Sequence, residues 1–177
     1  MTLVRTGHFV FESGDHGDTW LALDELVSNP GELRREAEDL AGRLGGYDAD
    51  LVCGPLEGGA FVAQWVAALL GARFTYSRRE RRRRYVTPAE VPVLGARVAL
   101  VDDAVNVGSA TIATAHELSG RGAEVVVLAS LLACLPNGPR VGARLGVPQV
   151  YLTAVDSKLW PAGDCLLCRA GVPIGAY

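Results

Sequence analysis

From residue 50 onward, short apolar runs alternate along the chain with segments of helical length. The apolar runs predict strands at 50–53, 73–76, 97–101, 124–132 and 150–154. Helices are expected at 60–70 and 108–119, closed by Gly71 and Gly120. Apolar strands joined by such helices form a mostly parallel sheet that is covered on both faces. We therefore predict an α/β fold, a single domain with a mostly parallel sheet flanked by helices.

The first 46 residues precede this alternation. Apolar runs at 8–11 and 20–23 predict two short strands. Asn29-Pro30 predicts a helix start, because proline fits the first helical position, and one apolar helical face then continues to Gly45-Gly46. We divide the chain into N-terminal strands and helix (1–46), a parallel-sheet core (47–155) and a C-terminal tail (156–177).

The charge of the chain is unevenly distributed. The net charge is −3, yet six of the 17 basic residues lie at 78–84, which leaves 11 basic against 19 acidic residues elsewhere, because one of the 20 acids is Glu80. This balance gives no reason to expect a nucleic-acid partner. No apolar run has membrane-spanning length, and the amino terminus lacks the pattern of a secretory signal. With four cysteines expected to be reduced thiols, we predict a cytoplasmic protein without a membrane partner.

The most informative stretch is 98–111. Its buried strand delivers Asp102 and Asp103 to the carboxyl end, and a short glycine-containing loop then begins a helix. Free backbone N–H groups at that helix start, with the Ser109 and Thr111 hydroxyls, can bind a phosphate. The two carboxylates would repel a phosphate, so they need another ligand. Vicinal ribose hydroxyls can donate to both, and Mg²⁺ would balance the charge.

An ordinary strand-to-helix turn is the alternative interpretation of the same stretch. An aspartate there can cap the helix, with Ser109 and Thr111 on the first turn. This interpretation explains one aspartate but leaves Asp102 without a role at the end of a buried strand.

This stretch resembles the 5-phosphoribosyl 1-pyrophosphate (PRPP) signature of type I phosphoribosyltransferases. The signature consists of four apolar residues, two acids, and then Gly and Ser or Thr. Further stretches are similar to the orotate phosphoribosyltransferase branch: Gly7-His-Phe-Val-Phe-Glu-Ser-Gly14, Asp18-Thr-Trp20, Gly54-Pro-Leu-Glu-Gly-Gly59 and the tail Cys165-Leu-Leu-Cys-Arg-Ala-Gly-Val-Pro173. The resemblance implies a pentosyltransferase that moves ribose 5-phosphate from PRPP to a nitrogen base and releases pyrophosphate. Orotate is the leading candidate for the base, which would place the enzyme in pyrimidine nucleotide synthesis. The resemblance also implies Mg²⁺ carried by the substrate and a homodimer.

The resemblance assigns roles to three segments. Asp102 and Asp103 would hold the ribose hydroxyls as catalytic residues, and the next loop would hold the 5-phosphate through Asn106, Val107, Gly108, Ser109, Ala110 and Thr111. The turn formed by Leu56, Glu57, Gly58 and Gly59 would bind pyrophosphate. In the basic segment, Arg78 and Arg79 would bind pyrophosphate, and Arg82 would replace a catalytic lysine. Arginine neutralises charge on a leaving group but does not readily release a proton.

The chain departs from the family pattern where the base would bind. Orotate enzymes place a lysine before the N-terminal Ser-Gly and an arginine after the fourth strand, whereas this chain has Glu12 and Asn137. Arg140 is close enough in sequence to substitute for that arginine. These changes favour an altered base, or a domain that binds the sugar-phosphate without turnover.

Cys165 and Cys168 form half of a zinc-binding pattern, and the sequence has no second pair. A structural zinc site is one interpretation, with two chains of a dimer as one way to complete it, and a pair of plain thiols is the other. His16, in the polar loop, is expected to be solvated.

Three functions remain open from the sequence. The first is a phosphoribosyltransferase, for orotate or for a different base. The second is a non-catalytic or regulatory module that binds PRPP or a nucleotide. The third is a nucleic-acid binder, which only the arginine run favours.

Overall fold

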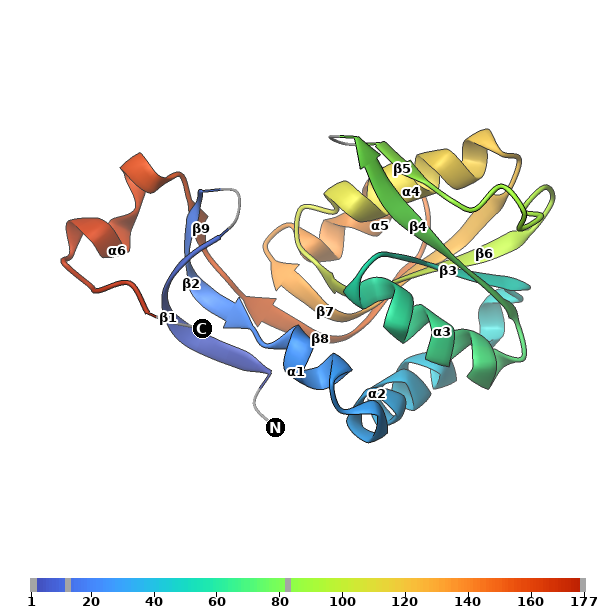
Figure 1. Ribbon diagram of the computed structural model, residues 1–177, viewed down its shortest axis with the longest axis horizontal. Coiled ribbons are helices and arrows are strands. Elements are labelled where there is room, and N and C mark those ends of the chain that lie inside the picture. Colours follow the sequence, from blue (N-terminus) through green and yellow to red (C-terminus); the bar gives the residue numbers. More distant parts are fainter. Residues whose placement is uncertain (1–2, 12–13, 82–83, 176–177) are drawn as a thin grey trace.

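The computed structural model describes residues 3–11, 14–81 and 84–175. Its main sheet has six strands in the order β5-β4-β3-β6-β7-β8 (Figure 1). The strands are β3 (Leu51–Pro55), β4 (Arg73–Arg81), β5 (Arg84–Val86), β6 (Arg97–Val105), β7 (Glu124–Leu135) and β8 (Gln149–Asp156). All neighbours pair in parallel except β5, which runs antiparallel to β4. The predicted α/β fold with a mostly parallel sheet is confirmed.

Helices cover both faces of this sheet (Figure 1). One face packs against α1 (Leu23–Val27), α2 (Pro30–Gly42) and α3 (Gly58–Leu70). The other packs against α4 (Ser109–Gly120) and α5 (Val141–Leu145). Alternate residues of the central strands supply the two cores: Val52 and Ala99 face the first, and Leu51 and Val98 face the second. Burial on both faces explains why these strands read as continuous apolar runs.

The ends of α2 and α3 follow the local signals in the sequence. The Asn29 side chain accepts a hydrogen bond from the Glu32 N–H at 3.4 Å and caps α2, with Pro30 at the first position. Gly71 ends α3 in the left-handed conformation, with φ +66°. The predicted start of α2 is confirmed, but the helix ends at Gly42, and the following residues 45–47 form a 3₁₀ turn.

Two strands are longer than their apolar runs. The apolar run predicts a strand at 73–76, but β4 continues to Arg81 and pairs with β5 as a hairpin. Strand β6 continues past Val101 to Val105, because β7 beside it continues to pair with Ala104 and Val105. The predicted ends of both strands were therefore wrong, since pairing with a neighbouring strand overrides side-chain polarity.

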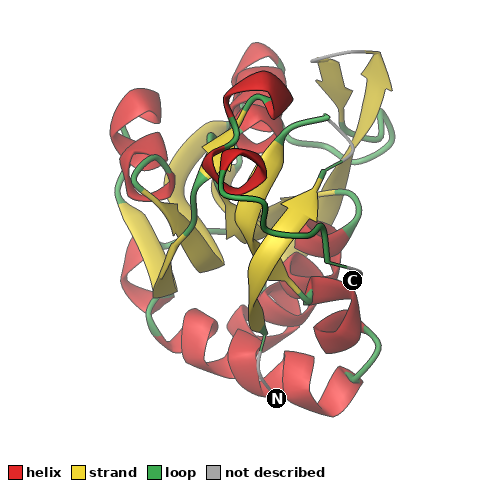
Figure 2. Cartoon of the chain, turned by 90° about the vertical axis from the view of Figure 1, so that its left-hand side faces the viewer, coloured by secondary structure: helices red, strands yellow, loops and turns green. Residues whose placement is uncertain are grey.

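A second, smaller sheet stands beside the main one (Figure 1 and Figure 2). Its order is β1-β2-β9, from β1 (Val4–Val10), β2 (His16–Leu21) and β9 (Leu159–Trp160). The chain thus returns to its N-terminal hairpin after β8, and a 3₁₀ turn (Ala162–Asp164) and α6 (Leu166–Arg169) follow. In the part of the chain that the structure describes, no helix combines the length and the apolar character needed to cross a bilayer.

Candidate active site

Asp102 and Asp103 lie on β6 at the carboxyl edge of the main sheet. Asp102 is buried, and its two carboxylate oxygens accept separate hydrogen bonds, from the Asp103 N–H at 3.0 Å and from the Thr111 hydroxyl at 3.0 Å. Asp103 accepts a hydrogen bond from the Ala104 N–H at 2.7 Å through Oδ1. The acidic pair is therefore held in a defined orientation before any ligand arrives.

Both carboxyl groups have raised pKa values. Burial is the main cause for Asp102 and moves its pKa well above the usual range, and the neighbouring Asp103 charge adds to the effect. Burial likewise raises the pKa of Asp103. An acidic pair with one buried and one half-buried member is costly to ionise, which is characteristic of sites that receive hydroxyl donors or a cation from a ligand.

The glycine-rich turn after β3 packs directly on this acidic pair. A Cβ added to Gly58 would lie 1.8 Å from Asp103 Oδ2, and one added to Gly59 would lie 2.4 Å from Asp102 Oδ1. The turn also contains a cis peptide between Leu56 and Glu57. Its Leu56 N–H donates to the Ser77 carbonyl at 2.7 Å, which joins the turn to β4. The two segments that the sequence singles out, 56–59 and 102–103, are thus brought into contact by the parallel pairing of β3 with β6.

The predicted phosphate loop connects β6 to α4. Asn106, Val107 and Ser109 are exposed, and Gly108 caps α4 in the left-handed conformation, with φ +75°. A side chain at Gly108 would also collide with Val141, whose Cγ1 would lie 2.6 Å from the new Cβ. The exposed Ser109 hydroxyl and the first backbone N–H groups of α4 can receive an anion there. The Thr111 hydroxyl, which the sequence places in the same role, is buried and donates to Asp102 instead.

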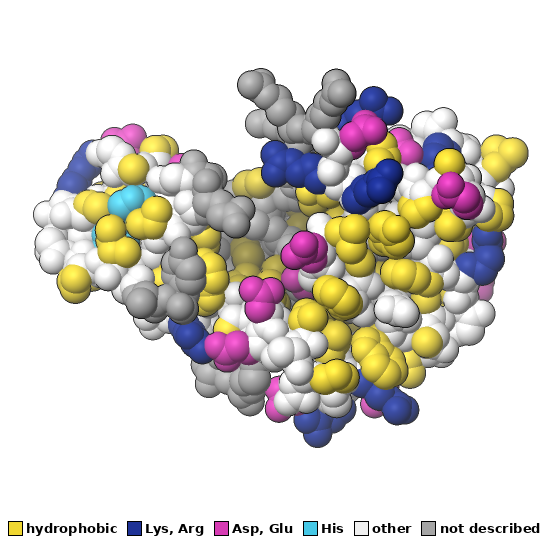
Figure 3. Space-filling view, in the orientation of Figure 1, with side chains coloured by type: hydrophobic (Ala, Val, Ile, Leu, Met, Phe, Trp, Pro, Cys, Tyr) yellow, Lys and Arg dark blue, Asp and Glu magenta, His cyan; other side chains and the backbone are white. Residues whose placement is uncertain are grey.

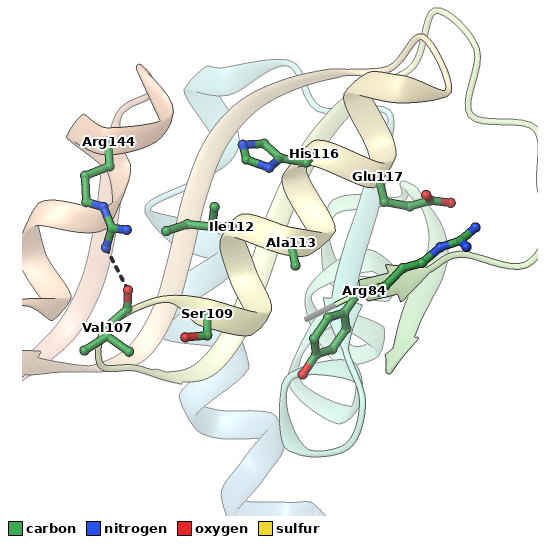
Figure 4. A pocket seen from close by; sticks show the side chains of 9 residues that line it. Arg84, Val107, Ser109, Ile112, Ala113, His116, Glu117 and Arg144 are labelled. Carbon is green, nitrogen blue, oxygen red and sulfur yellow. Dashed lines mark hydrogen bonds between the residues drawn. The ribbon is translucent and has the colours of Figure 1, made fainter. Parts of the chain in front are cut away.

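A cavity of about 640 Å³ lies on the outer side of α4, between this helix, β5 and α5 (Figure 4). Val107 and Ser109 form one end of it, and His116 and Glu117 form the other. Arg144 donates from Nη1 to the Val107 carbonyl at 2.8 Å and so holds the phosphate loop from this side. The acidic pair does not line this cavity, which therefore adjoins the candidate active site through the loop only.

A smaller cavity, of about 220 Å³, lies between the two sheets. In Figure 3 a hollow separates the small part of the molecule from the main body. The lining combines Phe11, Thr19, Trp20 and Leu21 of the N-terminal hairpin with Asn106, Cys134, Ser157, Lys158 and Leu159. Phe11 and Trp20 stack with ring centroids 5.9 Å apart. Aromatic walls with a few polar groups suit a small planar heterocycle.

Lys158 is a cation at this cavity that the sequence did not assign to the base. It is the one lysine of the chain, and it lies just after β8, where the chain crosses to the small sheet. Its backbone N–H donates to Asp18 Oδ1 at 2.8 Å. Asn137, which stands where the family has an arginine, and Arg140, its candidate substitute, are exposed after β7 and do not line the cavity. Glu12 lies outside the described residues. The isolated lysine in an arginine-rich chain was the signal that could have found it.

The described part of the arginine run lies on a hairpin formed by β4 and β5. Arg78 pairs with Val86 and Arg79 with Tyr85 across β4 and β5, and both arginine residues are exposed. Arg82, the predicted counterpart of a catalytic lysine, lies outside the described residues.

Comparison with known proteins agrees with this geometry. Residues 22–161 match the family model "Phosphoribosyl transferase domain". The chain belongs to the phosphoribosyltransferase family. It is 32% identical over 175 residues to the orotate phosphoribosyltransferase of Thermotoga maritima, covering 94% of this chain and 87% of that protein. It is 27% identical to the orotate phosphoribosyltransferase of Caldanaerobacter subterraneus subsp. tengcongensis, over 98% of this chain and 90% of the other.

The fold of this phosphoribosyltransferase is also similar to that of a solved relative. The crystal structure of orotate phosphoribosyltransferase from Aeropyrum pernix superposes with a TM-score of 0.73 at 25% identity, covering 86% of this chain and 88% of that chain. The family assignment from the sequence is therefore confirmed.

Proposed function

We propose that this phosphoribosyltransferase is an orotate phosphoribosyltransferase. In the reaction, the bond between C1 of the ribose and pyrophosphate breaks, pyrophosphate leaves with the electron pair, and a ring nitrogen of orotate forms the new bond to C1. The similarity of nearly the whole chain to orotate enzymes supports the base, and the acidic pair packed against the glycine turn supports the sugar-phosphate. The acidic pair is the observation that carries the proposal.

Each of the three segments of the candidate site would bind a different part of PRPP. Asp102 and Asp103 would accept hydrogen bonds from the two ribose hydroxyls. Their raised pKa values favour this role, because hydroxyl donors lower the free-energy cost of ionising the two carboxyl groups. Ser109 and the start of α4 would hold the 5-phosphate, together with backbone groups of 106–108. The turn 56–59, with Arg78 and Arg79 on the hairpin, would face pyrophosphate, and Arg82, which lies outside the described residues, would act in place of a catalytic lysine.

The residues present fit a Mg²⁺ ion carried by pyrophosphate. Three carboxyl groups, of Glu57, Asp102 and Asp103, belong to the turn and the strand end where pyrophosphate would lie, and they would repel that anion without a cation. When bound, Mg²⁺ would neutralise charge on the leaving pyrophosphate. The chain itself would contribute orientation and charge stabilisation, the main means of catalysis for this type of transfer.

The base would lie in the cavity of about 220 Å³ between the two sheets. Asn106 at its edge belongs to the phosphate loop, so a base in this cavity would be next to the ribose. Lys158 is the cation at this cavity that can pair with the carboxylate of orotate. We further propose that the enzyme acts in the cytoplasm as a homodimer.

Calorimetric titration with PRPP and Mg²⁺ tests the sugar-phosphate site. We expect binding to the native chain and its loss in the double variant Asp102→Asn with Asp103→Asn. Asp50→Asn is the matched control, because Asp50 pairs with Arg73 on the surface at the opposite edge of the sheet. Unchanged binding in the double variant would reject the site.

Pyrophosphate release with orotate, uracil and adenine then tests the reaction. Release with orotate alone is expected. Release with a different base would replace orotate as the substrate, and PRPP binding without release would identify a binding module in place of an enzyme.

A further inference from the structure

Four potential metal ligands meet in the small part of the molecule, away from the candidate active site. His8 lies on β1, His16 lies on β2, and Cys165 and Cys168 lie at the start of α6 and within it. One ligand atom from each side chain falls within 4.8 Å of all the others. Among the described residues, this is the one group of three or more such side chains that could hold a metal ion. Two distant ends of the chain therefore supply one cluster.

The distances within the cluster match a tetrahedral site. Cys165 Sγ and Cys168 Sγ lie 3.5 Å and 3.6 Å from His8 Nε2, and Cys168 Sγ lies 3.3 Å from His16 Nδ1. A tetrahedron with Zn–N near 2.05 Å and Zn–S near 2.3 Å has edges of roughly 3.3–3.8 Å. The two nitrogen atoms, 2.9 Å apart, are slightly closer than such an edge. A small outward movement of one imidazole would complete the geometry.

Hydrogen bonds around the cluster orient its nitrogen and sulfur atoms for binding a cation. His8 Nδ1 lies 2.8 Å from the Val172 carbonyl, which can accept only from a protonated nitrogen. In neutral His8 the Nε2 lone pair is then directed at the other three ligands, as in zinc sites where a carbonyl fixes the imidazole tautomer. The Cys168 N–H donates to Cys165 Sγ at 3.4 Å, which stabilises a thiolate there.

Burial argues against a plain pair of hydrogen-bonded histidines. His8, His16 and Cys165 are all buried, with 2%, 9% and 1% of their surface exposed. The Nε2 lone pair of His8 can accept one hydrogen, yet three ligand atoms converge on it. One Zn²⁺ with two thiolates and two neutral imidazoles would satisfy all four groups and leave the cluster without net charge.

We propose that His8, His16, Cys165 and Cys168 form a structural zinc site within one chain. Two nitrogen and two sulfur ligands in a closed tetrahedron select Zn²⁺ among the common divalent ions. Binding displaces one proton from each thiol, and no oxidant or reductant is needed. From the sequence, two chains of a dimer are one way to complete the ligand set, and His16 is expected to be solvated. The structure instead buries His16 beside His8, so a single chain supplies the full set.

The metal would fasten the tail to the N-terminal hairpin. Strand β9 pairs with β2 at His16 and Gly17, and the Gly175 N–H donates to the His8 carbonyl at 2.7 Å, so the tail already follows the hairpin on both sides of the cluster. Lys158 and Leu159, at the start of this tail, line the cavity between the sheets. The zinc site would therefore hold one wall of that cavity in place.

Metal analysis of the untagged full chain, purified without chelators, tests the proposal. We expect one equivalent of zinc per chain by mass spectrometry, and loss of most of it in Cys165→Ser with Cys168→Ser and in His16→Asn. His116→Asn and Cys134→Ala are the matched controls, because these residues lie outside the cluster and should leave the zinc content unchanged. Zinc retained by the cluster variants would reject the ligand set.

Cobalt replacement gives a second readout that does not depend on the variants folding. Metal-free native chain reconstituted with Co²⁺ should show the visible absorption of a tetrahedral ion and a thiolate-to-cobalt charge-transfer band. Absence of both zinc and these bands, or a disulfide between Cys165 and Cys168 in the freshly purified protein, would overturn the proposal. None of these readouts uses PRPP or a base, so they remain valid if the proposed activity fails.

Discussion

Asp102 and Asp103 show how far a fold can change the chemistry of ordinary side chains. Both are aspartates whose pKa values burial raises, the first more strongly because its neighbour's charge adds to the effect. A carboxyl group whose pKa is higher in the folded than in the unfolded state stabilises the fold at low pH. That contribution is lost as the pH rises through the folded-state pKa. The acidic pair thus lowers stability at neutral pH in return for a site that accepts hydroxyl donors.

Asp103→Asn should raise the stability of the fold at neutral pH. We expect the free energy of unfolding at pH 7.5 to rise by on the order of 1 kcal/mol, because the charge of half-buried Asp103 beside buried Asp102 is removed. An asparagine oxygen can still accept from the Ala104 N–H. Urea unfolding at pH 7.5 and at pH 4 measures the effect, and the gain should be smaller at pH 4. A gain that is larger at pH 4 would contradict the raised pKa.

Lys158→Gln tests the base cavity at a single residue. Loss of a charge-assisted hydrogen bond costs about 1.5–3 kcal/mol, so KM for orotate should rise by roughly tenfold or more. The Kd for PRPP should remain unchanged, and Lys158→Arg should recover part of the affinity. Steady-state kinetics of Lys158→Gln and of Arg140→Gln show whether Lys158 or Arg140 binds the orotate carboxylate. A rise in KM in that variant alone would place the carboxylate beyond the end of β7.

Among the elements, the turn after β3 depends most on its residue types. Gly54 lies under the turn, since a Cβ there would meet the Gly59 carbonyl oxygen at 2.4 Å, and Gly58 and Gly59 touch the acidic pair. Backbone can approach this closely only where side chains are absent. The sequence predicted a glycine-rich turn, and the parallel register of β3 against β6 decided what the turn would contact.

Gly59→Ala should disturb both elements at once. The new Cβ would lie 2.4 Å from Asp102 Oδ1 and 3.0 Å from Pro55 Cδ, so the turn or the acid must move. We expect a loss of about 1–3 kcal/mol in unfolding free energy and a marked weakening of PRPP binding. Gly42→Ala in α2 is the matched control, because its Cβ meets nothing within 4 Å and should stabilise by about 0.5–1 kcal/mol. Unfolding experiments and calorimetric titration with PRPP on Gly59→Ala and Gly42→Ala would show whether the close approach of the turn to Asp102 determines stability and binding.

At the scale of the whole molecule, the smaller sheet joins a hairpin from the N-terminal part of the chain to β9 from its C-terminal part. The main sheet carries the sites for phosphate and ribose, and the hairpin and tail close the cavity between the sheets. Small sheets bury little apolar surface, so they often need a further constraint to be stable. The proposed zinc site would supply that constraint.

Metal removal should therefore act on the smaller sheet before the main one. A chelator that strips zinc should lower the melting temperature by about 5–10 °C, on the basis of about 2–4 °C for each kcal/mol in a chain of this size. With Mg²⁺ restored, KM for the base should rise while the Kd for PRPP stays near its original value. Calorimetry and kinetics before and after adding zinc back would measure both effects. An unchanged melting temperature would contradict a structural role for the metal.

The sequence by itself determined the local elements and one segment of the site. Apolar runs and helix caps predicted the α/β core, and the acidic pair with its glycine loop predicted the phosphoribosyl site, because these signals lie within a few residues of one another. Tertiary structure decided what distant residues do together. Pairing with β5 and β7 extended β4 and β6 beyond their apolar runs, and the Thr111 hydroxyl was directed to Asp102. The return of the tail brought Lys158 to the cavity and two cysteines to His8 and His16, since such contacts depend on where the chain crosses between sheets and leave no local pattern.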